Sequence, residues 1–339
     1  MLRHEVYGRR MNVKYTMLEN GLDFIITGLE HLQNAEQDNV EEIVRDRELK
    51  YSLLHLSAGI ELVFKNRLDI EHWTYIFDDM NHASRNKYTD GSLKTVDSNT
   101  AIERLENLCG YVFTEKQKVQ LKRLRETRNR FEHGAIDNNP RAVESVINNA
   151  VEVIVDFLGK NYNEFEIPSN MLSDGLTERE KEYYKRLQIA TKKLKNHHDD
   201  AVKLAISRAL NITLQEYLME CPECGEMLLR YGDGNTQCEC YYCGYSEKPA
   251  NVAKKYIEKV LHISEYEVGH HGGEFPLFTC PDCDTDSMVK TDSSYFCFCC
   301  GTKYQLNELK YCERCGELFF SIDDDFICKD CMDGQINER

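Results

Sequence analysis

The stretch CPECGEMLLRYGDGNTQCECYYCG, residues 221–244, decides the fold of the C-terminal third of this 339-residue chain. It holds two Cys-x-x-Cys knuckles, and each is followed by a glycine that allows the backbone to turn and aim amide groups at thiolate sulfur. Fifteen residues separate the knuckles, which suits a hairpin that gathers four thiolates into a tetrahedron. We therefore predict a four-cysteine metal site.

The same pattern occurs twice more, with thirteen and then twelve residues between the knuckles. The three repeats predict three structural Zn²⁺ ions, because four sulfur ligands leave no coordination position open for catalysis. The knuckles of the second and third sets could also pair in an interleaved order, but the loop lengths favour sequential pairing. The predicted ligands are Cys221, Cys224, Cys240, Cys243, Cys280, Cys283, Cys297, Cys300, Cys312, Cys315, Cys328 and Cys331.

Three cysteines remain outside this pattern. Cys238 and Cys299 each lie within two residues of a predicted ligand and could substitute for it, whereas Cys109 follows an apolar helix face and is predicted to be a core residue. Fourteen of the fifteen cysteines lie beyond residue 220, mostly in paired spacing, which indicates metal binding in a reducing compartment rather than disulfides. The first residues lack the apolar stretch of a secretory signal, and no segment approaches the roughly 18 apolar residues of a membrane span. We expect a cytoplasmic protein without membrane contact.

Residues from about 13 to 160 have the pattern of a helical bundle. A first apolar stripe at the helical period contains Leu18, Leu22, Ile25, Leu29 and Leu32. A helix at about 41–66 is apolar nearly all round between residues 53 and 64, which is typical of the central helix of a bundle. The polar stretch 81–100 is predicted to be a loop, and a short helix carries Ile102, Leu105 and Leu108.

Two further helix starts are marked by capping residues. Thr114 followed by Gln117 predicts a capping box for a helix that ends near His133, and Asn139 before Pro140 predicts the cap of the next helix. A third capping box at residues 177–180 opens a charged region that we predict to be a connecting pair of helices. The expected organisation is mainly α: a helical domain at 1–165, a connector at 166–218, zinc ribbons at 219–248, 278–304 and 305–339, and a linker helix at 249–277.

The helix that ends at His133 concentrates positive charge in a chain whose formal net charge is −16. Arg128 follows Leu124 by four residues, which predicts that it continues the inner stripe of the helix. Asn129 and His133 are also four residues apart, so the three polar side chains can line one broad face.

The segment LRETRNRFEHG, residues 124–134, resembles the Arg-polar-x-x-x-His motif of the HEPN superfamily, the higher eukaryotes and prokaryotes nucleotide-binding domains. HLSAGIELVFKNRL, residues 55–68, is similar to the second long helix of these domains. The resemblance covers about residues 13–160. It implies a metal-independent endoribonuclease that acts on RNA as a homodimer, with the two motifs facing a shared cleft, and it implies a role in prokaryotic defence or toxin systems.

The resemblance assigns a role to each candidate catalytic residue. His133 would transfer protons, Arg128 would stabilise charge on the phosphate, and Asn129 would orient the phosphate or the imidazole. Glu61 is isolated in an apolar helix and could hold Arg128 by an ion pair. The alternative partners are Glu132 for Arg128 and Lys65 for Glu61. A second match to the arginine and histidine spacing, Arg67 with His72, has Leu68 where the family prefers a polar residue.

The predicted ribbons have acidic loops, which oppose phosphate contact. Their partner could be RNA or a protein, and exposed aromatic residues could either stack on bases or pack the hairpins. The alternative functions are a non-catalytic dimerisation adaptor, whose ribbons bind protein or nucleic acid, and a zinc-ribbon transcription regulator, which the acidic loops disfavour. The paired histidines at 197–198 and 270–271 are out of register with the knuckles and are predicted to be surface residues.

Overall fold

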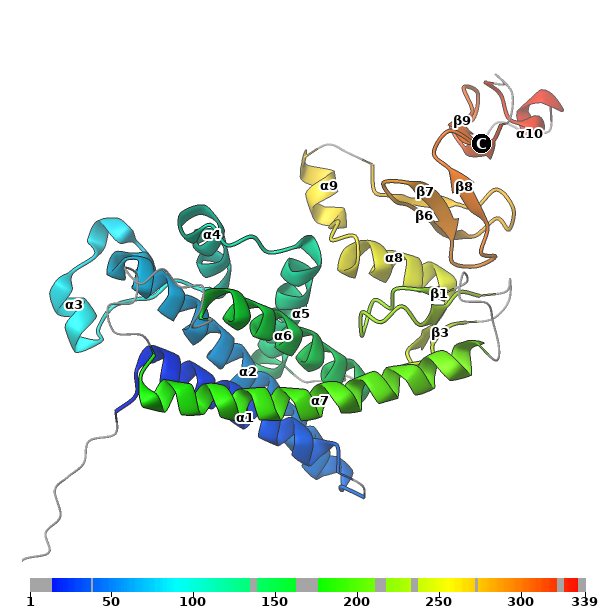
Figure 1. The fold of residues 1–339 in the computed structure, drawn as a ribbon. Coiled ribbons are helices and arrows are strands. Elements are labelled where there is room, and N and C mark those ends of the chain that lie inside the picture. The colour runs from blue at the N-terminus through cyan, green and yellow to red at the C-terminus, as the bar shows by residue number, and fades with distance from the viewer. Residues whose placement is uncertain are drawn as a thin grey trace, which may run out of the picture. The chain divides into compact units, whose positions relative to one another are not determined.

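The computed structural model describes residues 14–37, 39–134, 139–162, 176–210, 218–232, 237–271, 274–321 and 326–334. The chain divides into two compact units, one of Met1–Asp137 and Val146–Asn196 and the other of Asn138–Ser145 and His197–Arg339. The first is helical, whereas the second combines small sheets with short helices (Figure 1). The predicted connector 166–218 therefore falls partly in each unit.

The first unit is built on a helical hairpin. Helix α1, Met17–Ala35, begins with a capping box between Thr16 and Glu19 and buries the predicted apolar stripe. Helix α2 spans Glu42–Glu71, and the two helices approach closely where Gly59 of α2 faces Gly21 and Ile25 of α1. The absence of a side chain at Gly59 allows this approach.

Helix α2 packs against helices α4, Ser98–Cys109, and α5, Glu115–His133. Phe64 of α2 contacts Phe113 and also Phe157 of helix α6, Pro140–Asn161, with ring centroids 5.6 and 4.7 Å apart. The central position expected of this helix is therefore observed, although its residues between 53 and 64 are not buried all round. Leu54, Ala58 and Leu62 stay half-exposed.

The predicted loop at 81–100 is wrong in part. The short helix η1 (Trp73–Ile76) precedes this stretch, η2 (Met80–His82) ends in it, α3 (Arg85–Asp90) lies within it, and α4 already begins at Ser98. Tertiary contacts stabilise α3, since the Arg85 guanidinium lies 4.2 Å from the ring centroid of Trp73 and Tyr88 donates a 2.9 Å hydrogen bond to Asp69. These tertiary contacts stabilise a short helix in a segment whose polar sequence predicts a loop.

The predicted pair of helices after residue 177 is also wrong, because Glu178–Leu210 is one helix, α7. The sequence contains no glycine or proline between these residues to break it. Its first half belongs to the first unit and runs beside α1, where Arg179 pairs with Glu19 at 3.4 Å and Arg186 with Glu30 at 3.6 Å (Figure 1).

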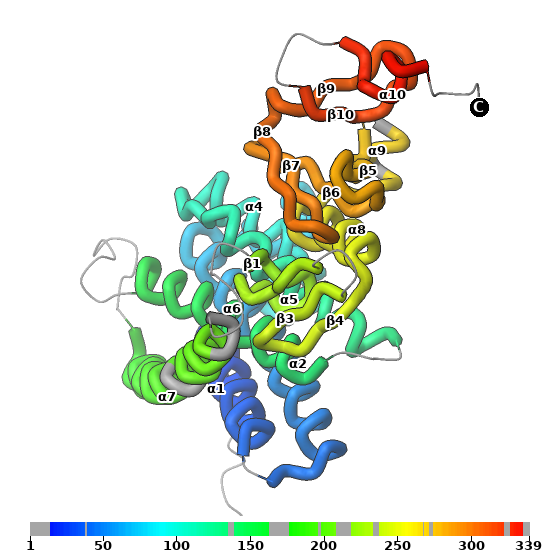
Figure 2. Tube along the Cα trace, turned by 90° about the vertical axis from the view of Figure 1, so that its right-hand side faces the viewer, coloured from blue at the N-terminus to red at the C-terminus, as the bar shows by residue number. Residues whose placement is uncertain are grey.

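Among the residues that the structure describes, the second unit has three antiparallel sheets. The first has the order β1 (Leu218–Met219), β2 (Leu229–Arg230), β3 (Cys238–Cys240) and β4 (Ser246–Glu247), and is followed by α8 (Pro249–Lys259) and α9 (Glu265–His271). The second has the order β5 (Leu277–Thr279), β6 (Asp286–Lys290), β7 (Ser294–Cys297) and β8 (Lys303–Gln305). The third pairs β9 (Leu309–Tyr311) with β10 (Leu318–Phe320), and α10 (Lys329–Met332) follows (Figure 2).

The first two sheets share one core. Val252 and Ile257 of α8 are buried in the same cluster as Phe298, which follows β7. Tyr231 packs on Phe296 with ring centroids 5.3 Å apart. The third sheet packs through Leu309 of β9 and Leu318 of β10 on a separate cluster with Met288 and Tyr295 of the second sheet, and its cysteines form a small cluster with Phe319. The first two predicted ribbons are therefore one folding unit with α8. Among the described helices, none is long and apolar enough to cross a membrane.

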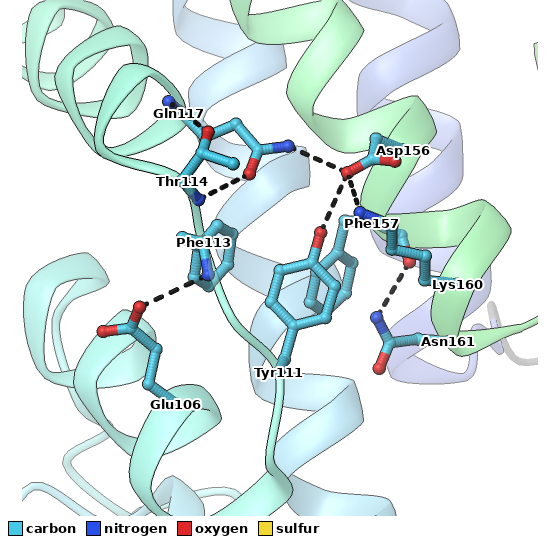
Figure 3. A network of polar contacts seen from close by, with 9 residues as sticks. All are labelled: Glu106, Tyr111, Phe113, Thr114, Gln117, Asp156, Phe157, Lys160 and Asn161. Carbon is cyan, nitrogen blue, oxygen red and sulfur yellow. Dashed lines mark hydrogen bonds and ion pairs between the residues drawn. The ribbon is translucent and has the colours of Figure 1, made fainter.

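A polar network joins α5 to α6 (Figure 3). Asp156 Oδ2 accepts hydrogen bonds from Lys160 at 2.7 Å, from Gln117 at 2.8 Å and from the Tyr111 hydroxyl at 3.2 Å. Gln117 also accepts a bond from the Thr114 amide and completes the capping box predicted for α5. Burial alone would raise the pKa of Asp156, but these hydrogen bonds outweigh it and lower the pKa.

We expect Asp156→Asn to lower the free energy of unfolding at pH 7 by about 1 kcal/mol or less, because the carboxylate is partly exposed and screened by water. The pKa of Asp156 is lower in the folded state. The contribution of Asp156 to the free energy of unfolding is therefore fully present above about pH 3.9, the pKa of an unperturbed aspartate. It is lost as the pH falls through the pKa that Asp156 has in the folded state. Urea unfolding at a series of pH values from 7 down to 3 measures this, and the difference between wild type and variant should become smaller as the pH falls below the ordinary pKa. Asp46→Asn, whose ion pair with Arg45 is long at 3.8 Å, is the control.

Candidate metal centres and the polar cluster at the end of α5

Three groups of four cysteines each bring their sulfur atoms within 4.8 Å of one another. Two Sγ–Sγ distances in each group lie between 3.6 and 3.8 Å. Four thiolates at a Zn–S distance of about 2.3 Å would stand about 3.8 Å apart at the corners of a tetrahedron. The cysteines are therefore arranged as a four-coordinate metal ion requires, and none forms a disulfide in the described residues.

The groups pair neighbouring knuckles, so the sequential order is confirmed for the second and third sets. Cys238 and Cys299 lie outside the groups that the described residues form. The Cys238 thiol donates to the carbonyl of Phe298 at 3.4 Å, and burial raises the pKa of this thiol to about 12. Cys299 is buried in the core of the second sheet. Neither residue substitutes for a knuckle cysteine.

The knuckles have the turn that their sequence predicts. Gly225, Gly244, Gly301 and Gly316 all have φ between 73 and 81°, a region that side chains disfavour. Amide groups point at sulfur as expected, since Cys299 N lies 3.4 Å from Cys297 Sγ and Cys328 N lies 3.3 Å from Cys312 Sγ. Two knuckles lack this glycine: Cys283 is followed by Asp284, which has a φ of 53°, and Cys331 is followed by Met332, the last residue of α10. The left-handed turn therefore follows five of the six knuckles, and one of these five has aspartate instead of glycine.

The thiols within a group strongly affect one another's ionisation. Hydrogen bonds with Cys221, Cys240 and Cys243 raise the pKa of Cys224, whereas a hydrogen bond from Cys280 lowers the pKa of Cys297 to about 4. Close thiols share protons in this way because several neighbouring thiolates repel one another. A divalent cation offsets that repulsion and displaces the protons.

Residues at the start of α6 form hydrogen bonds to the backbone of the first cysteine group. The sequence contains no signal for these contacts. Ser145 donates a 2.9 Å hydrogen bond to the carbonyl of Cys224, and Asn139 donates to the carbonyl of Cys243. His198 of α7 lies 3.6 Å from Glu226 and 3.3 Å from the Tyr242 hydroxyl, so its prediction as a surface residue is wrong. His270 is exposed as predicted, and the side chains of His197 and His271 lie outside the description. These contacts position the backbone of both knuckles.

The predicted catalytic residues gather at the C-terminal end of α5. The Arg128 guanidinium donates to Asn129 Oδ1 at 3.2 Å and pairs with Glu132 at 3.0 Å, and Glu132 lies 3.9 Å from His133 Nε2. The Arg128 side chain is 38% exposed and that of His133 is 78% exposed. The buried residue after Leu124 is Thr127, three positions on, so the prediction that Arg128 continues the inner stripe is wrong. On a helix, the third and the fourth residue after Leu124 lie about equally close to the apolar stripe, so spacing alone does not decide between Thr127 and Arg128.

Glu61 does not join this cluster. Its carboxylate pairs with Lys65 at 2.5 Å and accepts a 3.1 Å hydrogen bond from Ser98. The structure therefore has the alternative partner in both cases: Glu61 pairs with Lys65, and Arg128 pairs with Glu132. The Glu61–Arg128 pair is not among the contacts of the described residues.

The second match to the motif has a structural use. The Arg67 side chain is 12% exposed, pairs with Glu71 at 3.0 Å and donates to Asn161 at 3.2 Å. His72 caps η1 by accepting from the amide of Thr74. The Arg67 side chain is thus mostly buried and already bonded to two other side chains, whereas Arg128 and His133 remain accessible to a ligand.

Comparisons of this chain with protein-family models, with curated proteins and with solved structures found no match.

Proposed function

We propose that this protein is a metal-independent endoribonuclease whose helical unit carries the chemistry and whose metal-stabilised unit recognises the substrate or a partner. The observation that carries the proposal is the cluster of Arg128, Asn129 and His133, three side chains exposed together at the end of one helix. None of the three is buried in the core of the unit. A cation, an amide and an imidazole in this arrangement suit a phosphate diester.

Cleavage of RNA without a metal needs a base for the 2'-hydroxyl, an acid for the 5'-oxygen that leaves, and cations for the charge on phosphorus. The 2'-oxygen attacks the phosphorus as it loses its proton, the 5'-oxygen departs with a proton, and a 2',3'-cyclic phosphate remains. One imidazole cannot readily serve at both oxygens. We therefore propose that two chains pair, so that each supplies one His133 and one Arg128 to a shared site.

Glu132 gains a role in this proposal that the sequence did not suggest. Its carboxylate lies beside both Arg128 and His133 and holds them on one face. A phosphate that enters would compete with Glu132 for the Arg128 guanidinium. Glu132 would then be free to orient the imidazole.

We propose Zn²⁺ as the ion in the three cysteine groups. Four thiolates in a tetrahedral set favour zinc, and closed coordination confines the ion to a structural role. The sequence of the ribbons is acidic, so we propose that they contact RNA bases or a protein rather than phosphates.

One observation favours the alternative of a non-catalytic adaptor. The ion pair between Arg128 and Glu132 is an ordinary contact four residues apart on a helix, and it already neutralises the guanidinium. A chain in which this pair is never displaced would bind partners through its ribbons without cleaving RNA.

We expect purified zinc-loaded protein to cleave single-stranded RNA in buffer without added divalent metal. His133→Ala should lower the rate by about 10²-fold or more, because proton transfer is lost, and Arg128→Ala should do the same by removing charge stabilisation. Gel analysis of a labelled RNA gives the rate, and end-group analysis identifies the 2',3'-cyclic phosphate.

His82→Ala and Arg186→Ala are the matched controls. His82 is 81% exposed and pairs with Asp79, and Arg186 pairs with Glu30, so each loses a surface ion pair of the same unit. Both should cleave like wild type. Equal cleavage by His133→Ala, Arg128→Ala and wild type would overturn the proposal. RNA left intact by folded, zinc-loaded wild type, but bound by it, would support the adaptor instead.

A further inference from the structure

A second cluster of ionisable side chains lies on the α1–α2 hairpin, apart in sequence from both groups of sites above. Its centre is His31 of α1, whose Nδ1 lies 2.7 Å from Oε2 of Glu48 on α2. Glu48 is 7% exposed, and Arg47 binds its other oxygen at 2.9 Å. Asn34 Nδ2 is 3.4 Å from the oxygen that His31 uses. A buried carboxylate with this many partners is held in a fixed position.

The contact fixes the orientation of the His31 ring. The hydrogen bond with His31 lowers the pKa of Glu48 against the effect of burial, so the carboxylate is ionised and accepts. His31 Nδ1 therefore donates its proton to Glu48, and Nε2 keeps a lone pair when the ring is neutral. The side chain is 25% exposed, which gives solvent ions access to the ring. Histidines that bind metals are commonly oriented by a carboxylate in this way.

The neighbouring imidazole has a nitrogen without a partner. His55 Nδ1 is buried and makes no hydrogen bond to any described residue. Burial lowers the pKa of His55, and His31 lowers it further whenever the His31 ring is protonated; Asp23 opposes both effects, and the His55 ring is neutral at pH 7. A neutral ring nitrogen that is buried without a partner is costly unless a ligand occupies it.

The separation of the two rings fits a shared ion. Their centroids are 5.2 Å apart with an interplanar angle of 65°. Two imidazoles that bind one tetrahedral ion at about 2.1 Å would have centroids about 5.3 Å apart, since each centroid lies roughly 1.2 Å behind its nitrogen. We propose that His31 and His55 form a binding site for a divalent transition metal such as Ni²⁺, Cu²⁺ or Zn²⁺, with Glu48 as the residue that positions His31.

The site differs chemically from the cysteine groups. Two nitrogen ligands leave at least two positions of a tetrahedral ion to water or to a ligand, so the ion is exchangeable rather than enclosed. Nitrogen donors select borderline transition metals and not Mg²⁺ or Ca²⁺, which take oxygen ligands. The negative charges of Glu48 and Asp23 favour a cation here, whereas Arg47 opposes it from the far oxygen of Glu48.

The test is a calorimetric titration of the full-length, zinc-loaded chain with Ni²⁺ at pH 7.5. We expect one Ni²⁺ per chain in wild type and none in either His31→Gln or His55→Gln. Glu48→Gln should weaken binding by about 10- to 100-fold, as loss of an orienting carboxylate does elsewhere. The zinc that the protein releases during the titration is measured in parallel, because Ni²⁺ that enters a cysteine group would displace zinc.

His82→Gln is the matched control. His82 Nδ1 also pairs with a carboxylate at 2.7 Å, that of Asp79, but the described structure places no second imidazole against it. This variant should bind Ni²⁺ like wild type. Circular dichroism confirms that each variant is folded, and His55→Gln leaves the His31–Glu48 pair intact if His31→Gln does not fold. Absence of a Ni²⁺ equivalent in wild type, or equal binding by His55→Gln, would show that the rings only pack together.

Discussion

We expect Cys240→Ser to bind two metal ions per chain instead of three and to unfold the part of the second unit around the first cysteine group. Apparent binding free energies of structural zinc sites are about 10–16 kcal/mol, which equals or exceeds the whole stability of a typical domain. Cys240 is 1% exposed and lies in the same core cluster as Val252, Ile257 and Phe298. The loss should therefore spread from β3 into α8 and the second sheet.

Metal content by mass spectrometry and hydrogen exchange of the amides in α8 measure this effect. Cys238→Ser is the matched control, because Cys238 is equally buried two residues away and its hydroxyl replacement still donates to the carbonyl of Phe298. It should keep three ions. Protection of α8 that is unchanged in Cys240→Ser would contradict the shared core. Hydrogen exchange of Cys312→Ser should change around β9 and β10 and in the part of the second sheet packed on Leu309 and Leu318, but not in α8, whose Val252 and Ile257 belong to a different cluster.

We expect Gly59→Ala to lower the free energy of unfolding of the first unit by about 3 kcal/mol, the upper range for overpacking. A methyl group at Gly59 would lie 2.6 Å from Ile25 Cγ1, 2.7 Å from the carbonyl oxygen of Gly21 and 2.9 Å from the amide nitrogen of Ile25. Two of these atoms belong to the backbone of α1 and cannot rotate away. The helices must therefore separate, which loosens the packing of α1 on α2.

Gly159→Ala is the opposite case in the same unit. Gly159 also lies within a helix, but a methyl group there would meet no described atom within 4 Å. Alanine favours a helix over glycine by about 1 kcal/mol, so this variant should be slightly more stable than wild type. Urea unfolding of both variants gives the comparison. Equal stabilities would mean that α1 and α2 shift apart without cost.

The sequence predicted those features that are set by residues close together in the chain. The bounds of α5 follow from Thr114 and Gln117 at its start and from His133 before Gly134 at its end, and the structure has the same bounds. The three cysteine groups were predicted from spacings of twelve to fifteen residues. Capping boxes and knuckles depend on hydrogen bonds and turns within a few residues, so their sequence signals are complete in themselves.

The tertiary structure alone decided which of two possible partners a side chain has and which distant groups meet. It placed Arg128 against Glu132 and Glu61 against Lys65, and it joined the start of α6 to the first cysteine group. It also brought His31 beside His55, 24 positions on in the sequence, where neither residue has a recognisable spacing. These contacts depend on how α1 crosses α2 and on the choice between neighbours on a helix surface. Many pairings of similar energy satisfy the same apolar pattern, and only the packed core selects one of them.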